Sequence, residues 1–453
     1  MLALAVLLLQ QAPAVRPTDA AIVRAVDSLL SRAVDGKALA GASVLVARGG
    51  RVVLARGYGK ADLEQDVPAT ERTVYRIGSL TKQFTAALIL QLADSGRLRL
   101  DDELSAYVPD FPLQGRHVTI RQLLNHTSGI PSYTGLGPLF FERVSRLRTP
   151  PESILALVAG KPFDFEPGTS WRYDNTGYVL LGMVLEKVTG RPYAELIQER
   201  IARPLGLADT RYCDEATIVP RRARGYGRDV SGVVNAAPID MSTPFAAGAL
   251  CSTVGDLERW RVALTSGRVI RPESYAMMIR PDTLSTGAAL SYGYGLAPAL
   301  LQGHRGIGHG GAINGFSSDI RWFPDDSVSV ILLGNGEGNL VGQLATRVAR
   351  AALGLPTPPR PSRPLPTADR DRFAGRYVTQ GGDTLQVAAA GDGLELRDPV
   401  EGPTRLLFQG GATFRPDNDD PMVFFFVTEG TRVTGLRIRV DGRVVAELGR
   451  VGA

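Results

Sequence analysis

The sequence predicts an α+β fold: an antiparallel sheet flanked by helices, with a helical lobe, followed by a small all-β barrel domain. The order of the predicted elements in residues 18–355 supports the first of these two domains. Residues 18–355 read as helix, hairpin, a block of helices, strands and a final helix, and this order does not fit alternating βαβ units. A second observation predicts the barrel, because the residues after 366 form short alternating strands separated by turns such as G-D-G and D-G.

The composition is that of an ordinary globular protein. The 453 residues are 44% hydrophobic and 21% charged, and the net charge is +5. The arginines are dispersed, and no basic block or interleaved aromatic stripe indicates a nucleic-acid groove. We therefore expect no nucleic-acid partner.

Residues 1–14, MLALAVLLLQQAPA, predict a signal peptide. Residues 2–9 are an apolar run of the right length, and Ala12-Pro13-Ala14 has the form of a cleavage site, although no basic residue precedes Arg16. A membrane-spanning helix needs about 20 apolar residues, so we expect no stable membrane span. The protein is expected in the periplasm or outside the cell.

The first domain is predicted over residues 15–355. A helix with Thr18 as its N-cap precedes a hairpin that turns at Gly49-Gly50. A second helix begins near Ser79, with Gly96 as its expected C-cap. Further elements are predicted as helices between 118 and 260, strands at 317–323 and 328–335, and a helix at 339–354.

Residues 356–366, PTPPRPSRPLP, predict a stiff linker because six of these eleven residues are proline. Residues 367–453 are the predicted barrel domain, which we expect to limit access to a cleft in the first domain. The only cysteines, Cys213 and Cys251, do not make a disulfide scaffold; two unpaired thiols are favoured, and their pairing is left open.

The first candidate site is Ser79 with Lys82. The chain has 51 basic residues but only five lysines, and only Lys82 has a serine three residues before it. On a helix the two side chains share one face, where a deprotonated lysine could act as base for a serine nucleophile. The alternative is a solvated helix face.

The second candidate site is Tyr173-Asp174-Asn175, the only Y-x-N in the chain. In an extended segment Tyr173 and Asn175 would point the same way, so that a phenol able to move a proton would stand beside an amide. The alternative is a buried tyrosine followed by an N-cap asparagine.

The third candidate site is His309-Gly310-Gly311, expected on a strand where glycines let a substrate backbone approach. The N–H of Ala312 could join that of Ser79 in an oxyanion hole. His304 has the same H-x-G form, but a glycine-rich bend and a strand follow His309. The G-x-G-x-x-G match from Gly306 to Gly311 lacks a following helix, which excludes a dinucleotide site.

Other chemistries lack their motifs. There is no G-x-S-x-G elbow for an α/β-hydrolase and no H-E-x-x-H, so we expect neither a metal nor a cofactor.

Taken together, the three sites resemble the serine β-lactamase and penicillin-binding-protein superfamily. The Y-x-N motif, LLNHTSGI at 123–130 and GALCSTVGDLERW at 248–260 are similar to the class C β-lactamase and D-amino-acid peptidase branch. The tail resembles the lipocalin-like barrel of some D-aminopeptidase relatives. By this resemblance Ser79 is the acylated nucleophile, Lys82 its base and Tyr173 the proton carrier, while Asn175 orients the substrate amide and the lysine.

The resemblance implies a β-lactamase/transpeptidase-like fold and a serine hydrolase that cleaves a small peptide, amide or ester. His309 stands where β-lactamases have the lysine of K-T-G, and a mostly neutral histidine there favours peptidase or esterase relatives. A D-amino-acid, DD-peptidase-like or CubicO-type peptidase leads; an esterase, a β-lactamase and a catalytically idle binding protein remain alternatives. The oligomeric state is left open.

Overall fold

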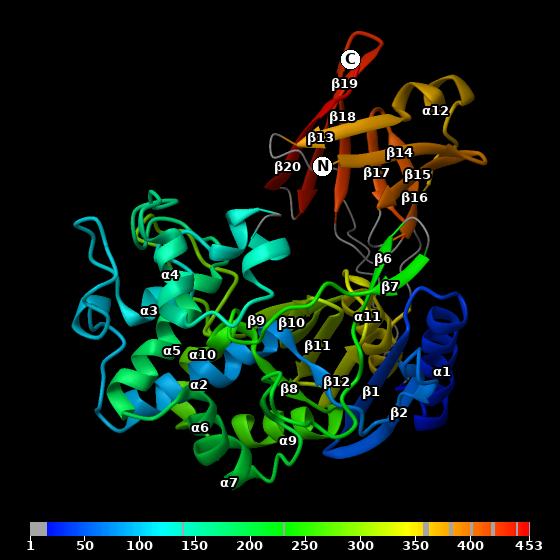
Figure 1. The fold of residues 1–453 in the computed structure, drawn as a ribbon. Coiled ribbons are helices and arrows are strands. Elements are labelled where there is room, and N and C mark those ends of the chain that lie inside the picture. Colours follow the sequence, from blue (N-terminus) through cyan, green and yellow to red (C-terminus); the bar gives the residue numbers. More distant parts are fainter. Residues whose placement is uncertain are drawn as a thin grey trace, which may run out of the picture.

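The computed structural model describes residues 16–137, 140–229, 232–356, 362–379, 384–398, 402–417, 422–440 and 443–452 (Figure 1). The predicted signal peptide lies outside the described residues, as does the central part of the predicted linker, 357–361. Neither prediction is therefore tested by the fold.

The first domain is built on a seven-stranded antiparallel sheet, as the sequence predicts. The strand order is β3-β2-β1-β12-β11-β10-β9, so the first and last parts of the domain pair at its centre. The strands are β1 (Gly41–Arg48), β2 (Arg51–Asp62), β3 (Val67–Pro68), β9 (Ala297–Leu301), β10 (His304–Ile313), β11 (Phe316–Phe323) and β12 (Val328–Gly334).

The central strands are buried on both faces. Helices α1 (Asp19–Asp35) and α11 (Leu340–Leu353) pack together on one face, where they share an apolar cluster with β1 and β12. The opposite face packs on the helical lobe through residues such as Leu45, Ile320 and Ile331. Near-continuous apolar strands such as Val328–Gly334 are what a sheet covered on both faces requires.

The helical lobe supplies one wall of the site. Its core is continuous with the inner face of the sheet, and α2 lies at its centre (Figure 1). The helices are α2 (Thr81–Asp94), α3 (Ile120–Leu124), α4 (Pro151–Ala159), α5 (Asn175–Thr189), α6 (Tyr193–Ile197), α7 (Arg203–Leu205), α8 (Phe245–Gly248), α9 (Val254–Thr265) and α10 (Pro272–Ile279). Short strands β4 (Tyr75–Arg76), β5 (Arg211–Tyr212), β6 (Tyr226–Asp229), β7 (Gly232–Asn235) and β8 (Leu250–Ser252) complete the domain.

Two local predictions need correction. Ser95, not Gly96, is the C-cap of α2, and Gly96 follows it in the left-handed region with φ +71°. Asn175 does not lie in an extended segment, because it is the first residue of α5. The N-cap is Asp174, whose carboxylate accepts from the backbone N–H groups of Thr176 and Gly177.

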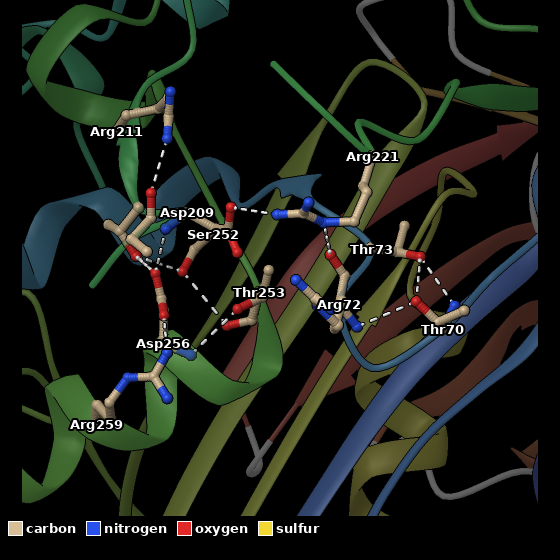
Figure 2. A network of polar contacts seen from close by, with 12 residues as sticks. Thr70, Arg72, Thr73, Asp209, Arg211, Arg221, Ser252, Thr253, Asp256 and Arg259 are labelled. Atoms are coloured by element: carbon tan, nitrogen blue, oxygen red, sulfur yellow. Dashed lines mark hydrogen bonds and ion pairs between the residues drawn. The ribbon is translucent and has the colours of Figure 1, made fainter. Parts of the chain in front are cut away.

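Strand β8 positions the segment that carries Ser79, and the buried carboxylate of Asp256 holds β8 in place through hydrogen bonds. Asp256, in the first turn of α9, accepts from the Asp209 N–H at 2.8 Å (Figure 2) and from the Thr210 hydroxyl at 3.0 Å. The Thr210 hydroxyl also bonds to Ser252 of β8 at 2.7 Å. Because β8 pairs with β4, this network fixes the chain just before Ser79.

The C-terminal region contains a closed eight-stranded barrel, which confirms the predicted barrel, although a short helix precedes its strands. Its described core combines aliphatic side chains with aromatic rings, of which Phe373, Phe414 and Phe426 are in mutual contact. Helix α12 (Thr367–Phe373) precedes the strands β13 (Gly375–Thr379), β14 (Thr384–Ala390), β15 (Gly393–Asp398), β16 (Gly402–Gly410), β17 (Thr413–Pro416), β18 (Val423–Glu429), β19 (Arg432–Val440) and β20 (Arg443–Arg450).

Cys213 and Cys251 are both free and buried, in agreement with the favoured prediction of unpaired thiols. Over the described residues, no helix is long and apolar enough to cross a membrane. The same residues contain no group of three or more histidine, cysteine, aspartate or glutamate side chains arranged to hold a metal ion.

Candidate active site

Ser79 lies in a single 3₁₀ turn, Gly78–Leu80, directly before α2. The turn is held on two sides: the Ile77 N–H donates to Leu250 of β8, and the Ser318 hydroxyl of β11 donates to the Ile77 carbonyl at 2.8 Å. Gly78 has φ +50°, and a Cβ there would lie 3.0 Å from the Ala312 nitrogen. Only glycine allows β10 to approach the serine this closely.

Lys82 is fully buried on the first turn of α2, and its amine faces Ser79. The Nζ atom lies 3.3 Å from Ser79 Oγ, 2.7 Å from Asn175 Oδ1 and 2.9 Å from the Ala247 carbonyl oxygen. The oxygens of Asn175 and Ala247 can only accept, so they take both N–H bonds of a neutral amine. The lone pair of that amine is then left for the Ser79 hydroxyl.

Burial supports the neutral amine. It lowers the pKa of Lys82 to about 7, and the nearby carboxylate of Asp174 only partly opposes the shift. Burial also raises the pKa of Asp174, although two backbone N–H groups favour its ionised form. Near neutral pH a large fraction of Lys82 is therefore unprotonated, which arginine at the same position could not achieve.

Tyr173 covers the lysine. The ring lies 4.7 Å from Lys82 Nζ, and the hydroxyl is close enough to Ser79 for that hydroxyl to lower the phenol's pKa against the larger raising effect of burial. Within the described residues the Tyr173 hydroxyl makes no hydrogen bond. It stays a protonated, unpartnered donor next to the serine.

Asn175 reaches the same point from the start of α5. Its Oδ1 accepts from Lys82, while its Nδ2 donates to the Thr134 hydroxyl at 3.2 Å. These two bonds fix which way the amide faces, so the side chain orients the lysine. The helix start, not an extended segment, brings Asn175 beside Tyr173.

His309 lies on β10, and its ring faces the tyrosine cluster. Its Nδ1 is 2.5 Å from the Gly310 carbonyl oxygen, which can only accept, so Nδ1 carries the proton. Its Nε2 then accepts from the Tyr292 hydroxyl at 2.8 Å. Burial, with the charge of Lys82, lowers the pKa of His309 to about 4. The ring is neutral, and both of its nitrogens are engaged within the protein.

The glycines of β10 form one side of the cleft. A Cβ on Gly311 would lie 2.2 Å from the Ile77 oxygen, so no other residue fits against the serine turn. The Ala312 nitrogen is close to the same turn, as an oxyanion hole with Ser79 requires. The cleft has a volume of 610 Å³ and is lined by Ser79, Tyr173, Asn175, His309, Gly310, Gly311, Ala312, Ser317, Ser318, Asp319, Gly338, Asn339 and Gly342.

Seven of the eight candidate residues thus line one cleft, and the eighth, Lys82, lies buried behind it in contact with Ser79 and Asn175. His304, the alternative histidine, is paired with Asp326 and is not among the residues that line it. Sequence reasoning missed Tyr292, the partner of His309, and Ala247, an acceptor for Lys82. The run SYGYG at 291–295 was a sequence signal that could have pointed to Tyr292. Ala247 contributes only its backbone carbonyl, which has no sequence signal.

The geometry suits acyl transfer. It brings together a hydroxyl, an amine with a free lone pair, a phenol donor and two backbone N–H groups. These are the parts needed to deprotonate a nucleophile, stabilise an oxyanion and protonate a leaving group.

Comparison with known proteins gives a match to the family described as Beta-lactamase over residues 26–354. The penicillin-binding protein 4* of Bacillus subtilis is 31% identical, over 79% of this chain and 83% of that protein. A D-aminopeptidase of Gluconobacter oxydans is 29% identical over 75% of this chain, which spans 63% of that longer protein.

Solved structures agree. An octameric penicillin-binding protein homologue from Pyrococcus abyssi has a TM-score of 0.68 at 27% identity and covers 94% of this chain and 99% of its own. A D-amino acid amidase from Ochrobactrum anthropi, solved with L-phenylalanine amide, has a TM-score of 0.65 at 28% identity. It covers 73% of this chain and 98% of its own.

Proposed function

Because the chain belongs to the β-lactamase family of serine hydrolases, we propose that it cleaves a small amide or peptide of a D-amino acid through a Ser79 acyl-enzyme. The observation that carries the proposal is the buried Lys82 amine, whose two N–H bonds are occupied and whose lone pair is left for Ser79.

In the first half-reaction Lys82 accepts the proton of Ser79, and the serine oxygen attacks the substrate carbonyl. The backbone N–H groups of Ser79 and Ala312 stabilise the oxyanion. The Tyr173 hydroxyl gives its proton to the leaving nitrogen and is reprotonated by Lys82. In the second half-reaction a water attacks the ester, the proton returns by the same route, and the acid is released.

Two observations support the substrate class. The described side chains that line the cleft are short or polar, and no leucine, isoleucine, valine or phenylalanine is among these described residues, so a long apolar acyl chain gains little there. The relatives named D-aminopeptidase and D-amino acid amidase support D-configured amides.

The state of His309 weighs against a β-lactamase. A lysine at this place would offer a fixed positive charge to a substrate carboxylate, whereas His309 is neutral and its nitrogens are engaged with Gly310 and Tyr292. We therefore expect poor turnover of carboxylate-bearing β-lactams. The esterase alternative shares every catalytic group and is separated by its substrates.

The site of action is also part of the proposal. The apolar run at residues 2–9 and the Ala12-Pro13-Ala14 cleavage form support export to the periplasm or beyond. N-terminal sequencing of protein secreted by the producing cell tests this; an uncleaved, cytoplasmic chain contradicts it.

Intact mass after treatment with a fluorophosphonate tests the nucleophile. A single adduct that maps to Ser79 and disappears in Ser79→Ala is expected. A panel of D- and L-alanine p-nitroanilides, p-nitrophenyl butyrate and nitrocefin then tests the substrate class. The D-anilide should be cleaved fastest; faster cleavage of butyrate or nitrocefin would favour the esterase or the β-lactamase, and absence of any adduct would favour an idle binding protein.

A further inference from the structure

His126 occupies a left-handed backbone position that favours glycine. Helix α3 ends at Leu124, Asn125 is its C-cap, and His126 follows with φ +63°. Glycine or asparagine normally takes this left-handed position after a helix, and histidine there costs conformational energy. Such strain persists where the side chain is needed, so the contacts of His126 matter.

Those contacts bracket Tyr173. The carbonyl of His126 accepts from the Arg172 N–H at 3.1 Å, and its Nδ1 accepts from the Asp174 N–H at 3.1 Å. The imidazole centroid also lies 4.4 Å from that of the Tyr173 ring. One residue thus holds the backbone before and after Tyr173 and packs on its ring.

The hydrogen bond from the Asp174 N–H also fixes the tautomer of the His126 imidazole. A backbone N–H can only donate, so Nδ1 has no proton and Nε2 carries it. Nε2 is buried and makes no hydrogen bond within the described residues. Burial, Lys82 and His309 together hold the pKa of His126 well below its usual value. The other titratable groups around the ring are the phenols of Tyr173, Tyr178 and Tyr292.

Tyr173 is held at its ring and not at its hydroxyl. The hydroxyl makes no hydrogen bond among the described residues. The rings of Tyr292 and His309 lie 6.1 Å from the Tyr173 ring, and that of His126, at 4.4 Å, is nearer. The direction of the phenol toward Ser79 therefore depends on the backbone and on ring packing, and His126 contributes to both.

We infer that His126 is a positioning residue, which holds the Tyr173 phenol in line with Ser79 and Lys82 for proton transfer. The inference rests on the proposed function. It assigns to the LLNHTSGI segment a role in the proton path, although His126 itself is not among the residues that line the cleft.

Two variants separate positioning from folding. His126→Gly relieves the strained φ and keeps the carbonyl, but it removes the acceptor for the Asp174 N–H and leaves a cavity beside Tyr173, so its thermal midpoint should fall. The rate of Ser79 phosphonylation by a fluorophosphonate and kcat on D-alanine p-nitroanilide should fall about 10- to 100-fold, with KM little changed. His126→Asn tolerates this φ and keeps an acceptor at the δ position, so it should recover most of the rate.

A double-mutant cycle tests whether His126 acts through Tyr173. In a Tyr173→Phe background, His126→Gly should cost little further, because the group it positions is already absent. Thr119→Val is the matched control: it removes the N-cap of the same short helix, at the end opposite to His126. It should lower the melting temperature and leave the phosphonylation rate unchanged.

The outcomes are distinct. Wild-type protein that takes no fluorophosphonate at Ser79 overturns the proposed function. Wild-type labelling with an equal rate in His126→Gly overturns the inference. So does a rate loss in His126→Gly that persists in full in the Tyr173→Phe background, or one that His126→Asn fails to recover.

Discussion

The first domain and the barrel differ in what they bury: the barrel buries apolar side chains, whereas the first domain also buries polar groups around its cleft. In the barrel the rings of Phe373, Phe414 and Phe426 pack on one another. Around the cleft, the first domain brings together the fully buried Lys82, the Tyr173 phenol, which makes no hydrogen bond within the described residues, and His126 with its positive φ. Apolar filling stabilises a domain, whereas buried polar groups cost stability and are retained where chemistry needs them. The difference assigns the chemistry to the first domain.

The largest effect should come from the charge-conserving change at the cleft. Lys82→Arg keeps a positive side chain but removes the group that can lose its proton, so acylation of Ser79 should fall about 10³-fold. Burst kinetics with p-nitrophenyl acetate measure this, with Lys187→Arg, on the surface end of α5, as the control. A near-wild-type burst in Lys82→Arg would remove lysine from the role of base.

The barrel should respond to a core change in stability and not in rate. Phe414→Ala deletes a fully buried ring and should cost about 3–5 kcal/mol of barrel stability. Denaturant unfolding measures the loss, while kcat for a small anilide should be unchanged when the barrel remains folded. A parallel loss of kcat for small substrates would show that the barrel shapes the catalytic site.

Buried Lys82 predicts a pH dependence of both activity and stability. Its folded pKa of about 7 lies below the unfolded value of about 10.4, so the unfolded chain binds more protons between these pH values. Unfolding free energy from this residue therefore rises from pH 7 toward pH 10, and acylation rises through pH 7 as the amine loses its proton.

Lys82→Met tests the stability half of that argument. It should raise the unfolding free energy by about 2 kcal/mol at pH 6, with the gain shrinking toward pH 10. Denaturant titrations at several pH values measure the difference. A constant difference across this range would mean that Lys82 does not change its protonation between the folded and unfolded states as argued.

The sequence was enough to predict the fold class and the residues of the cleft, because their signals are local. S-x-x-K sets two groups on one helical turn, and apolar alternation with turn residues predicts the sheet and the barrel strands. A chain with only five lysines also makes Lys82 conspicuous. These features need no knowledge of which segments meet.

The rest depends on contacts between distant segments. Asn175 reaches Tyr173 by the start of a helix because Asp174 takes the N-cap, and the Y-x-N spacing alone suggested a strand. The bracket that His126 forms around Tyr173 joins residues nearly fifty apart and needs a left-handed backbone, which no periodicity encodes. The run SYGYG draws attention to Tyr292, but only the fold shows that its hydroxyl donates to His309.

The smallest effect is expected at that pair. Tyr292→Phe removes only the hydroxyl that donates to His309, so the neutral form loses a hydrogen bond and the pKa of His309 should rise from about 4. Because the chain has four histidines, NMR titration of their ring protons can follow His309 directly. The rate of D-alanine p-nitroanilide cleavage should change by no more than about threefold. The rate of nitrocefin hydrolysis should increase at pH 5–6, where a protonated His309 can bind the carboxylate of nitrocefin.

Tyr107→Phe, at a phenol bound to Asp102 away from the cleft, is the control. If His309 titrates identically in both variants, the Tyr292 hydroxyl does not set its charge, and the exclusion of carboxylates must come from burial alone.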